Sequence, residues 1–192
     1  MTALIAGLVL FLGLHSIRFV ADGARSAFIA RYGVRAWRGL YSLVSAVGLV
    51  LIVWGYSLTL RRPIVLYEPS LLARELAAVL TWAGIVLIAA AYVPRNHFKA
   101  WVGHPMVLGT ALWALAHLQA TSTAADLLLF GGFLVWALWC FVSLRARDRA
   151  AGVQRAPGQP MRSVIALAIG TAAWAAFAFW LHAPLIGIAA IG

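Results

Sequence analysis

The sequence contains 192 residues, of which 64% are hydrophobic and 10% are charged, and its mean hydropathy is +0.94. Soluble domains are about half apolar and about one quarter charged. A 20.6 kDa protein cannot hide this much apolar surface from water, so the composition argues against a soluble globular domain. It also excludes a disordered chain, and the single Cys140 excludes a disulfide scaffold.

The formal net charge is +10, from 14 Arg, one Lys and five acidic residues. In a soluble protein this charge would indicate a nucleic-acid partner. Here the basic residues cluster in some loops and avoid others, which is typical of the residues that fix membrane topology and contact anionic head groups. We therefore predict contact with a lipid bilayer and no binding of nucleic acid.

Six apolar stretches are separated by short polar connections. They cover approximately residues 3–20, 39–60, 71–93, 105–120, 124–144 and 163–188. Most approach the roughly 20 residues that a spanning helix requires, but the fourth does so only if residues 98–104 are included. The first lacks the basic start of a signal peptide and is interpreted as a retained helix. We predict an all-α integral membrane bundle of six transmembrane helices, forming one domain over residues 1–192.

Local sequence signals support these boundaries. Thr123 and Asp126 have the spacing of a capping pair that opens the fifth helix. Pro105 suits the first turn of the fourth helix, and Pro94 closes the third. Glycines and prolines within residues 152–160 indicate a flexible loop before the sixth helix.

The basic residues also predict the orientation. Twelve lie on the side of the first, third and fifth connections, and three lie on the other side. The twelve are Arg18, Arg25, Arg31, Arg35, Arg38, Arg95, Lys99, Arg145, Arg147, Arg149, Arg155 and Arg162. The positive-inside rule then places the odd connections in the cytoplasm and both termini outside. The first connection, with Phe28, Tyr32 and Trp37, suits an interfacial helix, and a polar lid over a site is the alternative.

Histidines are the candidate functional residues, because ionisable side chains inside a membrane are costly. His15, His117 and His182 lie within or near the ends of predicted spans, and His104 lies at the mouth of the fourth. His97 lies in a basic loop, where we expect it to be solvated. Imidazole is a common ligand of haem iron and of zinc. Alternatively, each His forms a hydrogen bond within the bundle.

The pattern suits haem better than zinc. Zinc sites usually use four ligands, and the sequence has neither an HExxH nor a CxxC motif. Two imidazoles and an apolar slot are enough for haem. His104 and His117 are 13 residues apart, about 20 Å of rise and about 220° of rotation on a helix, so one straight helix cannot bring both to one ion.

The neighbours of these histidines on the same helix face suggest a cofactor slot. His117 shares a face with Trp113 and Gly109, and a Gly there would let a planar ligand approach the backbone. Arg18 shares a face with His15 and could pair with a haem propionate, or it could anchor the helix at the membrane surface.

Four segments resemble the NnrU family of membrane proteins. They are LFLGLHSIR (10–18), WRGLYSLVS (37–45), GHPMVLG (103–109) continuing through Trp113 to His117, and WLHAPLIG (180–187). The resemblance covers nearly the whole chain. It implies a multi-pass protein of the bacterial inner (cytoplasmic) membrane, associated with denitrification through nitrite and nitric oxide metabolism.

The NnrU family is similar to the plant zeta-carotene isomerases, integral membrane haem b enzymes that isomerise a cis double bond. By this resemblance the axial ligands of haem b fall on His15 and His117, and an alternative thiolate ligand falls on Ala114. The implied chemistry is that of a haem-dependent isomerase or oxidoreductase acting on a hydrophobic small molecule. Matching predicted depths would instead pair His15 with His104 and His117 with His182, so His104 and His182 are second choices, and one or two haems fit.

Two other functions are compatible with the sequence. Residues 104–109, HPMVLG, are similar to a motif that helps to hold S-adenosylmethionine in membrane isoprenylcysteine and thiol methyltransferases. Gly103 replaces the Arg of that motif and Val107 fills its Tyr position, so methyl transfer ranks second. The third is a non-enzymatic accessory protein of respiratory complexes, with a respiratory partner protein. A homo-oligomer is compatible with all three.

Overall fold

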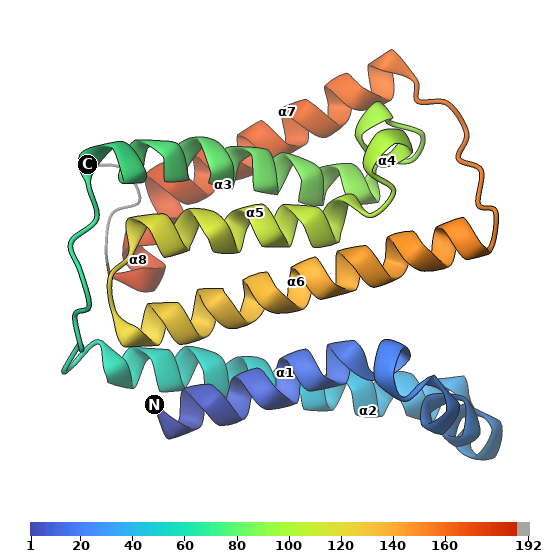
Figure 1. Cartoon of the computed structure of the whole chain (residues 1–192), viewed down its shortest axis with the longest axis horizontal. Helices are drawn as coiled ribbons and strands as arrows, with labels where there is room; N and C mark the ends of the chain where they lie inside the picture. The colour runs from blue at the N-terminus through green and yellow to red at the C-terminus, as the bar shows by residue number, and fades with distance from the viewer. Residues whose placement is uncertain (188–192) are drawn as a thin grey trace. The chain divides into compact units, whose positions relative to one another are not determined.

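The computed structural model describes residues 1–187 (Figure 1). The helices are α1 (Thr2–Val20), α2 (Asp22–Thr59), α3 (Leu71–Tyr92), α4 (His97–Val102), α5 (Pro105–Ala120), α6 (Ala124–Ala150), α7 (Pro160–Ala176), the π-helical turn η1 (Phe177–Leu181) and α8 (His182–Ile186). Across residues 1–187 the only β-type pairing is an isolated bridge between Val65 and Thr123. The predicted all-α class is confirmed. The last residue of the sixth predicted stretch, at 188, lies outside the described residues.

Five helical segments within the described residues are long and apolar enough to cross a membrane. They are α1, α2, α3, α6 and the continuous segment Pro160–Ile186. Helix α5 has the predicted bounds but only 16 residues, about 24 Å of rise, less than the roughly 30 Å of a hydrocarbon core. Residues 98–104 do not lengthen this helix, because Gly103 (φ +82°) separates α4 from α5. The six-span count and the sides of the termini stay predictions.

The chain divides into two compact units, and each is described by itself. The first unit contains Met1–Tyr67 and Thr123–Gly132, and the second contains Glu68–Ser122 and Phe133–Gly192. Helix α6 begins in the first unit and continues into the second. The single domain predicted from the sequence stays a prediction.

In the first unit, α1 and the long part of α2 run antiparallel and pack at glycines (Figure 1). A Cβ atom at Gly7 would lie 2.6 Å from the backbone N of Ile52 and 2.8 Å from the carbonyl O of Gly48. A Cβ at Gly48 would in turn lie 3.0 Å from the backbone N of Phe11. Small residues therefore let the two backbones approach closely, as is common between transmembrane helices.

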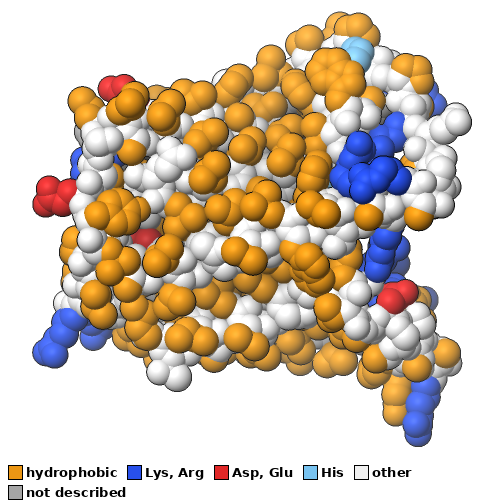
Figure 2. All heavy atoms as spheres, in the orientation of Figure 1, with side chains coloured by type: hydrophobic (Ala, Val, Ile, Leu, Met, Phe, Trp, Pro, Cys, Tyr) orange, Lys and Arg blue, Asp and Glu red, His pale blue; other side chains and the backbone are white. Residues whose placement is uncertain are grey.

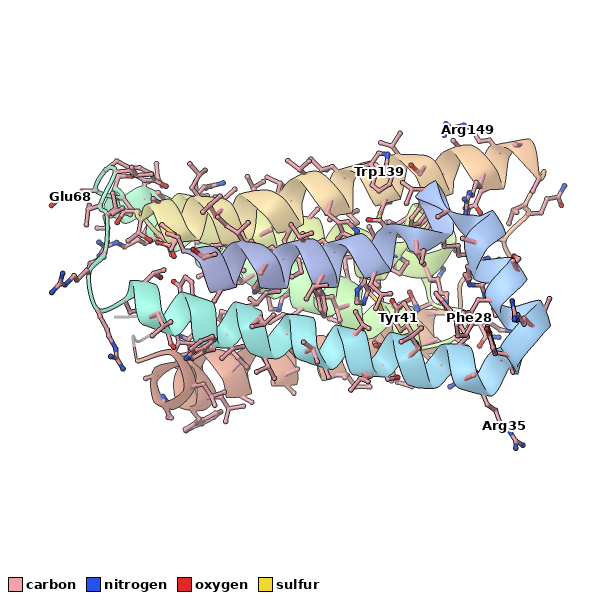
Figure 3. The ribbon with its side chains drawn as sticks, turned by 90° about the horizontal axis from the view of Figure 1, so that it is seen from below. Phe28, Arg35, Tyr41, Glu68, Trp139 and Arg149 are labelled. Atoms are coloured by element: carbon pink, nitrogen blue, oxygen red, sulfur yellow. The ribbon has the colours of Figure 1, made fainter. Side chains whose placement is uncertain are left out.

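Helix α2 is bent within its N-terminal third. At Gly33 the backbone leaves the helical region (φ 86°, ψ 161°) and separates residues 22–32 from residues 34–59. Figure 3 shows the two parts at an angle, with Arg35 projecting outward near the bend. The predicted interfacial segment is therefore helical, and its place in the head-group layer stays a prediction.

The beginning of α6 is held by the predicted capping pair. The backbone N–H of Thr123 donates to Oδ2 of Asp126 (2.9 Å), and the N–H of Asp126 donates to Oγ1 of Thr123 (3.2 Å). The hydroxyl of Tyr56 in α2 donates to Oδ1 of Asp126 (2.6 Å). Asp126 is only 4% exposed, so the cap also links α2 to the start of α6 within the first unit.

In the second unit, α3 packs against both α5 and α7 (Figure 1). The crossing of α3 with α5 lies at two facing glycines, since a Cβ at Gly84 would lie 2.8 Å from the carbonyl O of Gly109. The crossing of α3 with α7 is similarly close, since a Cβ at Gly170 would lie 2.5 Å from the Cα of Val86.

Two indoles join α3 and α7 by hydrogen bonds. Nε1 of Trp82 donates to Oγ1 of Thr171 (3.0 Å), and Nε1 of Trp174 donates to Oγ1 of Thr81 (3.1 Å). Such polar contacts between apolar helices satisfy side-chain donors that lipid could not satisfy. Hydrophobic side chains cover the helix bodies, whereas Lys and Arg gather at helix ends (Figure 2).

Candidate functional site

His15 lies in the last third of α1, in the first unit, and is half-buried. Its Nδ1 lies 2.7 Å from the carbonyl O of Phe11. Because a carbonyl can only accept, Nδ1 carries the proton, and in the neutral ring the lone pair is on Nε2. The ring stacks on Phe11 (centroids 4.2 Å apart, planes at 29°) and meets Tyr41 of α2 edge-on at 5.3 Å.

His117 repeats this arrangement in the last turn of α5, in the second unit. Its Nδ1 lies 2.8 Å from the carbonyl O of Trp113, so the neutral ring again has its lone pair on Nε2. The imidazole lies against the indole of Trp113, with centroids 4.9 Å apart, and that indole meets Phe133 edge-on at 5.6 Å. His117 is also half-buried.

The two histidines thus share one local motif, an aromatic residue four positions earlier whose carbonyl accepts the Nδ1 proton. Histidines that bind metals through Nε2 usually donate the other ring N–H to a carbonyl or carboxylate, which fixes the ring and its tautomer. A histidine without a metal can use the same bond to satisfy one ring nitrogen. Each unit therefore offers one imidazole whose Nε2 would be suited to hold a haem iron.

His182 and Arg18 were also predicted for the cofactor, and neither is part of this motif. His182 is half-buried and begins α8, directly after the π-helical turn η1, a feature frequent at functional sites. Its ring meets Phe177 edge-on at 6.1 Å. Arg18 is exposed in the last turn of α1. Both assignments stay predictions.

Helix packing explains the glycine at position 109, where the sequence had suggested the approach of a planar ligand. A Cβ there would lie 2.5 Å from the carbonyl O of Gly84 and 2.9 Å from Cγ1 of Ile88. Helix α3 therefore fills the space beside Gly109, and the close crossing of two helices explains the absence of a side chain. Trp113, one turn later on α5, retains its place beside His117.

His104 belongs to an ion cluster at the polar end of α6. It is the N-cap residue of α5, and its Nε2 lies 2.7 Å from Oδ2 of Asp148. Arg155, in the connection between α6 and α7, donates to the same carboxylate oxygen. Asp148 lies beyond the predicted apolar stretch of α6. Partial desolvation raises its pKa, but hydrogen bonds and charge from His104 and Arg155 outweigh this and hold the pKa below its ordinary value.

His97 is not solvated as expected. It is half-buried, its backbone N–H donates to Oγ of Ser163 (2.9 Å), and its Nδ1 lies 2.8 Å from the same oxygen. A Cβ at Gly158 would lie 2.6 Å from the Cα of His97, so the connection before α7 packs directly on it. His97 therefore joins α4 to α7. Ser163 lies 66 positions away, so no local signal could have predicted this.

A cavity in the first unit was not predicted from the sequence. It is an open hollow at the surface, with a volume of about 300 Å³, and is lined by Trp37, Arg38, Tyr41 and Ser42 of α2. Tyr41, labelled in Figure 3, also contacts the ring of His15 and lies 6.1 Å from the ring of Trp37. Within residues 1–187 no group of three or more His, Cys, Asp or Glu could hold a metal ion.

The sequence matches the family described as NnrU protein over residues 3–190, nearly its full length. The chain therefore belongs to the NnrU family, as its motifs had suggested. No curated protein and no solved structure matches it.

Proposed function

We propose that this NnrU-family chain is an integral membrane haem b protein in which His15 and His117 would each offer an imidazole to hold the haem iron. One observation carries the proposal. In both units an apolar helix holds an imidazole by the same Nδ1 hydrogen bond to the carbonyl four residues earlier, 2.7 Å in one and 2.8 Å in the other. The tautomer that binds iron through Nε2 is thereby selected in both places.

The surrounding residues orient these imidazoles. Phe11 and Trp113 lie against the two rings and limit their rotation, and both also supply the accepting carbonyls. Arg18 lies three residues after His15 at the polar end of α1, where a guanidinium suits a propionate. Bound haem supplies a redox-active iron whose reactivity depends on its axial ligands and on the polarity around it.

The wider role in this proposal comes from the family resemblance. It comprises a bacterial inner-membrane location, a link to nitrite and nitric oxide metabolism, and redox-gated chemistry that includes isomerisation of a hydrophobic substrate. Ala114, fully buried in α5, stands where the similar isomerases have an alternative thiolate ligand. We therefore propose permanent imidazole ligation.

A haem spectrum tests the proposal. The chain is expressed with haem supplementation, purified in mild detergent, and assayed for a Soret band and a pyridine haemochrome. We expect haem b with a six-coordinate, low-spin spectrum. A purified, monodisperse chain without a Soret band would refute the proposal. Calorimetry with S-adenosylmethionine on the same preparation tests the methyltransferase alternative.

Single variants test the assigned ligands. His15→Ala and His117→Ala should each lower the haem content or convert the spectrum to a five-coordinate, high-spin form. His97→Ala is the matched control, because it removes an imidazole that binds Ser163, and it should retain the low-spin spectrum. Added imidazole should restore that spectrum in His15→Gly and His117→Gly, which a purely structural role would not produce. Full low-spin haem in both Ala variants would show that the ligands are wrong.

A further inference from the structure

Two arginines converge on one glycine at the end of the second unit. The guanidinium carbon of Arg155 lies 2.6 Å, and Nη1 of Arg145 lies 3.1 Å, from the position that a Cβ of Gly103 would occupy. The guanidinium carbon of Arg155 and Nη1 of Arg145 are therefore at most 5.7 Å apart. Gly103 has φ +82°, so its own conformation disfavours a side chain, and the guanidiniums occupy the space that one would fill.

The positive charge at this place is not balanced by the residues that the structure describes. Asp148 is the only acidic residue in the cluster, and its carboxylate already accepts from Arg155 and lies 2.7 Å from His104. Arg145 is half-buried and forms no ion pair with any described residue. Figure 2 shows Lys and Arg side chains gathered beside α4, where the α6–α7 connection runs. Two close guanidiniums beside a single carboxylate, which contacts Arg155 and not Arg145, favour a further anion.

The surroundings of the arginine pair resemble a bilayer surface. Trp101, in α4 and two residues before Gly103, is 71% exposed, and exposed indoles are typical of the head-group layer. On α6, Leu138 and Val142 are 47% and 62% exposed, and they lie seven and three residues before Arg145 on nearly the same helix face. An exposed apolar stripe thus leads directly to the arginine pair.

We propose that Arg145 and Arg155 bind the phosphate of an anionic phospholipid, whose acyl chains lie along the exposed stripe of α6. Planar guanidiniums recognise phosphate through paired hydrogen bonds, and basic pockets between membrane helices bind acidic head groups. The apolar stripe favours a lipid over a free anion. This site is separate from the histidines of the proposed haem, so either proposal can fail without the other.

Lipid retention tests the site. The chain is reconstituted in nanodiscs of phosphatidylcholine with and without phosphatidylglycerol, extracted gently, and examined by native mass spectrometry for bound lipid. We expect wild type to retain phosphatidylglycerol preferentially and Arg145→Gln to bind it about five-fold more weakly. Arg149→Gln, which removes an exposed charge one turn later on α6, is the control and should retain it as wild type does.

A further variant tests whether the site requires the planar guanidinium, and a competition experiment tests whether it binds a lipid or a free phosphate. Arg145→Lys keeps the charge without the planar fork and should show intermediate binding, which also guards against a misfolded Gln variant. Equal retention of phosphatidylglycerol by wild type and Arg145→Gln would overturn the proposal. Displacement of the lipid by millimolar inorganic phosphate would overturn it as well, because the site would then bind a free anion.

Discussion

Replacement of Gly7 by Ala should separate α1 from α2, and Gly13 on the same helix is its control. A Cβ at Gly7 would lie 2.6 Å from the backbone N of Ile52 and 2.8 Å from the carbonyl O of Gly48, and backbone atoms cannot rotate away. Overpacking of this kind costs about 1–3 kcal/mol, and Ala regains up to about 1 kcal/mol of helix propensity. With the full gain in helix propensity, we therefore expect Gly7→Ala to lower the free energy of unfolding by up to about 2 kcal/mol.

Gly13→Ala should have the opposite sign. Beyond its chain neighbours and its own turns of helix, no atom of the described residues lies within 4 Å of a Cβ at Gly13, so only the gain in helix propensity remains, up to about 1 kcal/mol. The free energy of unfolding is measured for both variants in mild detergent by titration with dodecyl sulfate, followed by Trp fluorescence. A Gly7→Ala protein as stable as Gly13→Ala would refute the inference that glycine contacts set the α1–α2 distance.

Two further variants test the polar clusters. Asp126→Ala should lower the free energy of unfolding by about 3 kcal/mol, because it leaves half-buried donors of Tyr56 and Thr123 without their buried acceptor, and Tyr56→Phe should lower it by about 1 kcal/mol. Equal free energies of unfolding for Asp126→Ala and Tyr56→Phe in the dodecyl sulfate titration would contradict this prediction. The pKa of Asp148 is lower in the folded state than its ordinary value of 3.8. The ionised carboxylate of Asp148 therefore stabilises the fold fully above pH 3.8, and this stabilisation is lost as the pH falls through the folded pKa. Thermal unfolding should therefore show wild type losing its advantage over Asp148→Asn in acid, and a constant advantage would contradict the assigned ion pairs.

Helix ends could be predicted where local chemistry sets them. Helix α5 has the bounds predicted from the sequence, since Pro105 can occupy its first turn and a polar segment follows Ala120. Hydropathy failed where a helix continues beyond the apolar stretch. Helix α6 continues to Ala150, because polar and basic residues can also form helix. The helix over residues 22–32, in contrast, was expected from the aromatic and basic residues of the first connection.

The contacts of the histidines differ in how far apart the two bonded residues lie along the chain. The bonds of His15 and His117 join positions four apart on one helix, so an aromatic residue four positions earlier was a usable signal. The pairing of His104 with Asp148 joins residues 44 positions apart and requires the connection that carries Arg155 to fold back. Hydropathy and spacing contain no information on such contacts.

This difference in range bears on the choice of haem ligands. The orienting bonds of His15 and His117 lie within single helices, so they do not depend on how the helices pack. His104 uses Nε2, the nitrogen through which it would bind iron, to contact Asp148, and would have to give up that contact to become a ligand. Breaking a half-buried polar pair is costly, and this counts against His104 as a ligand.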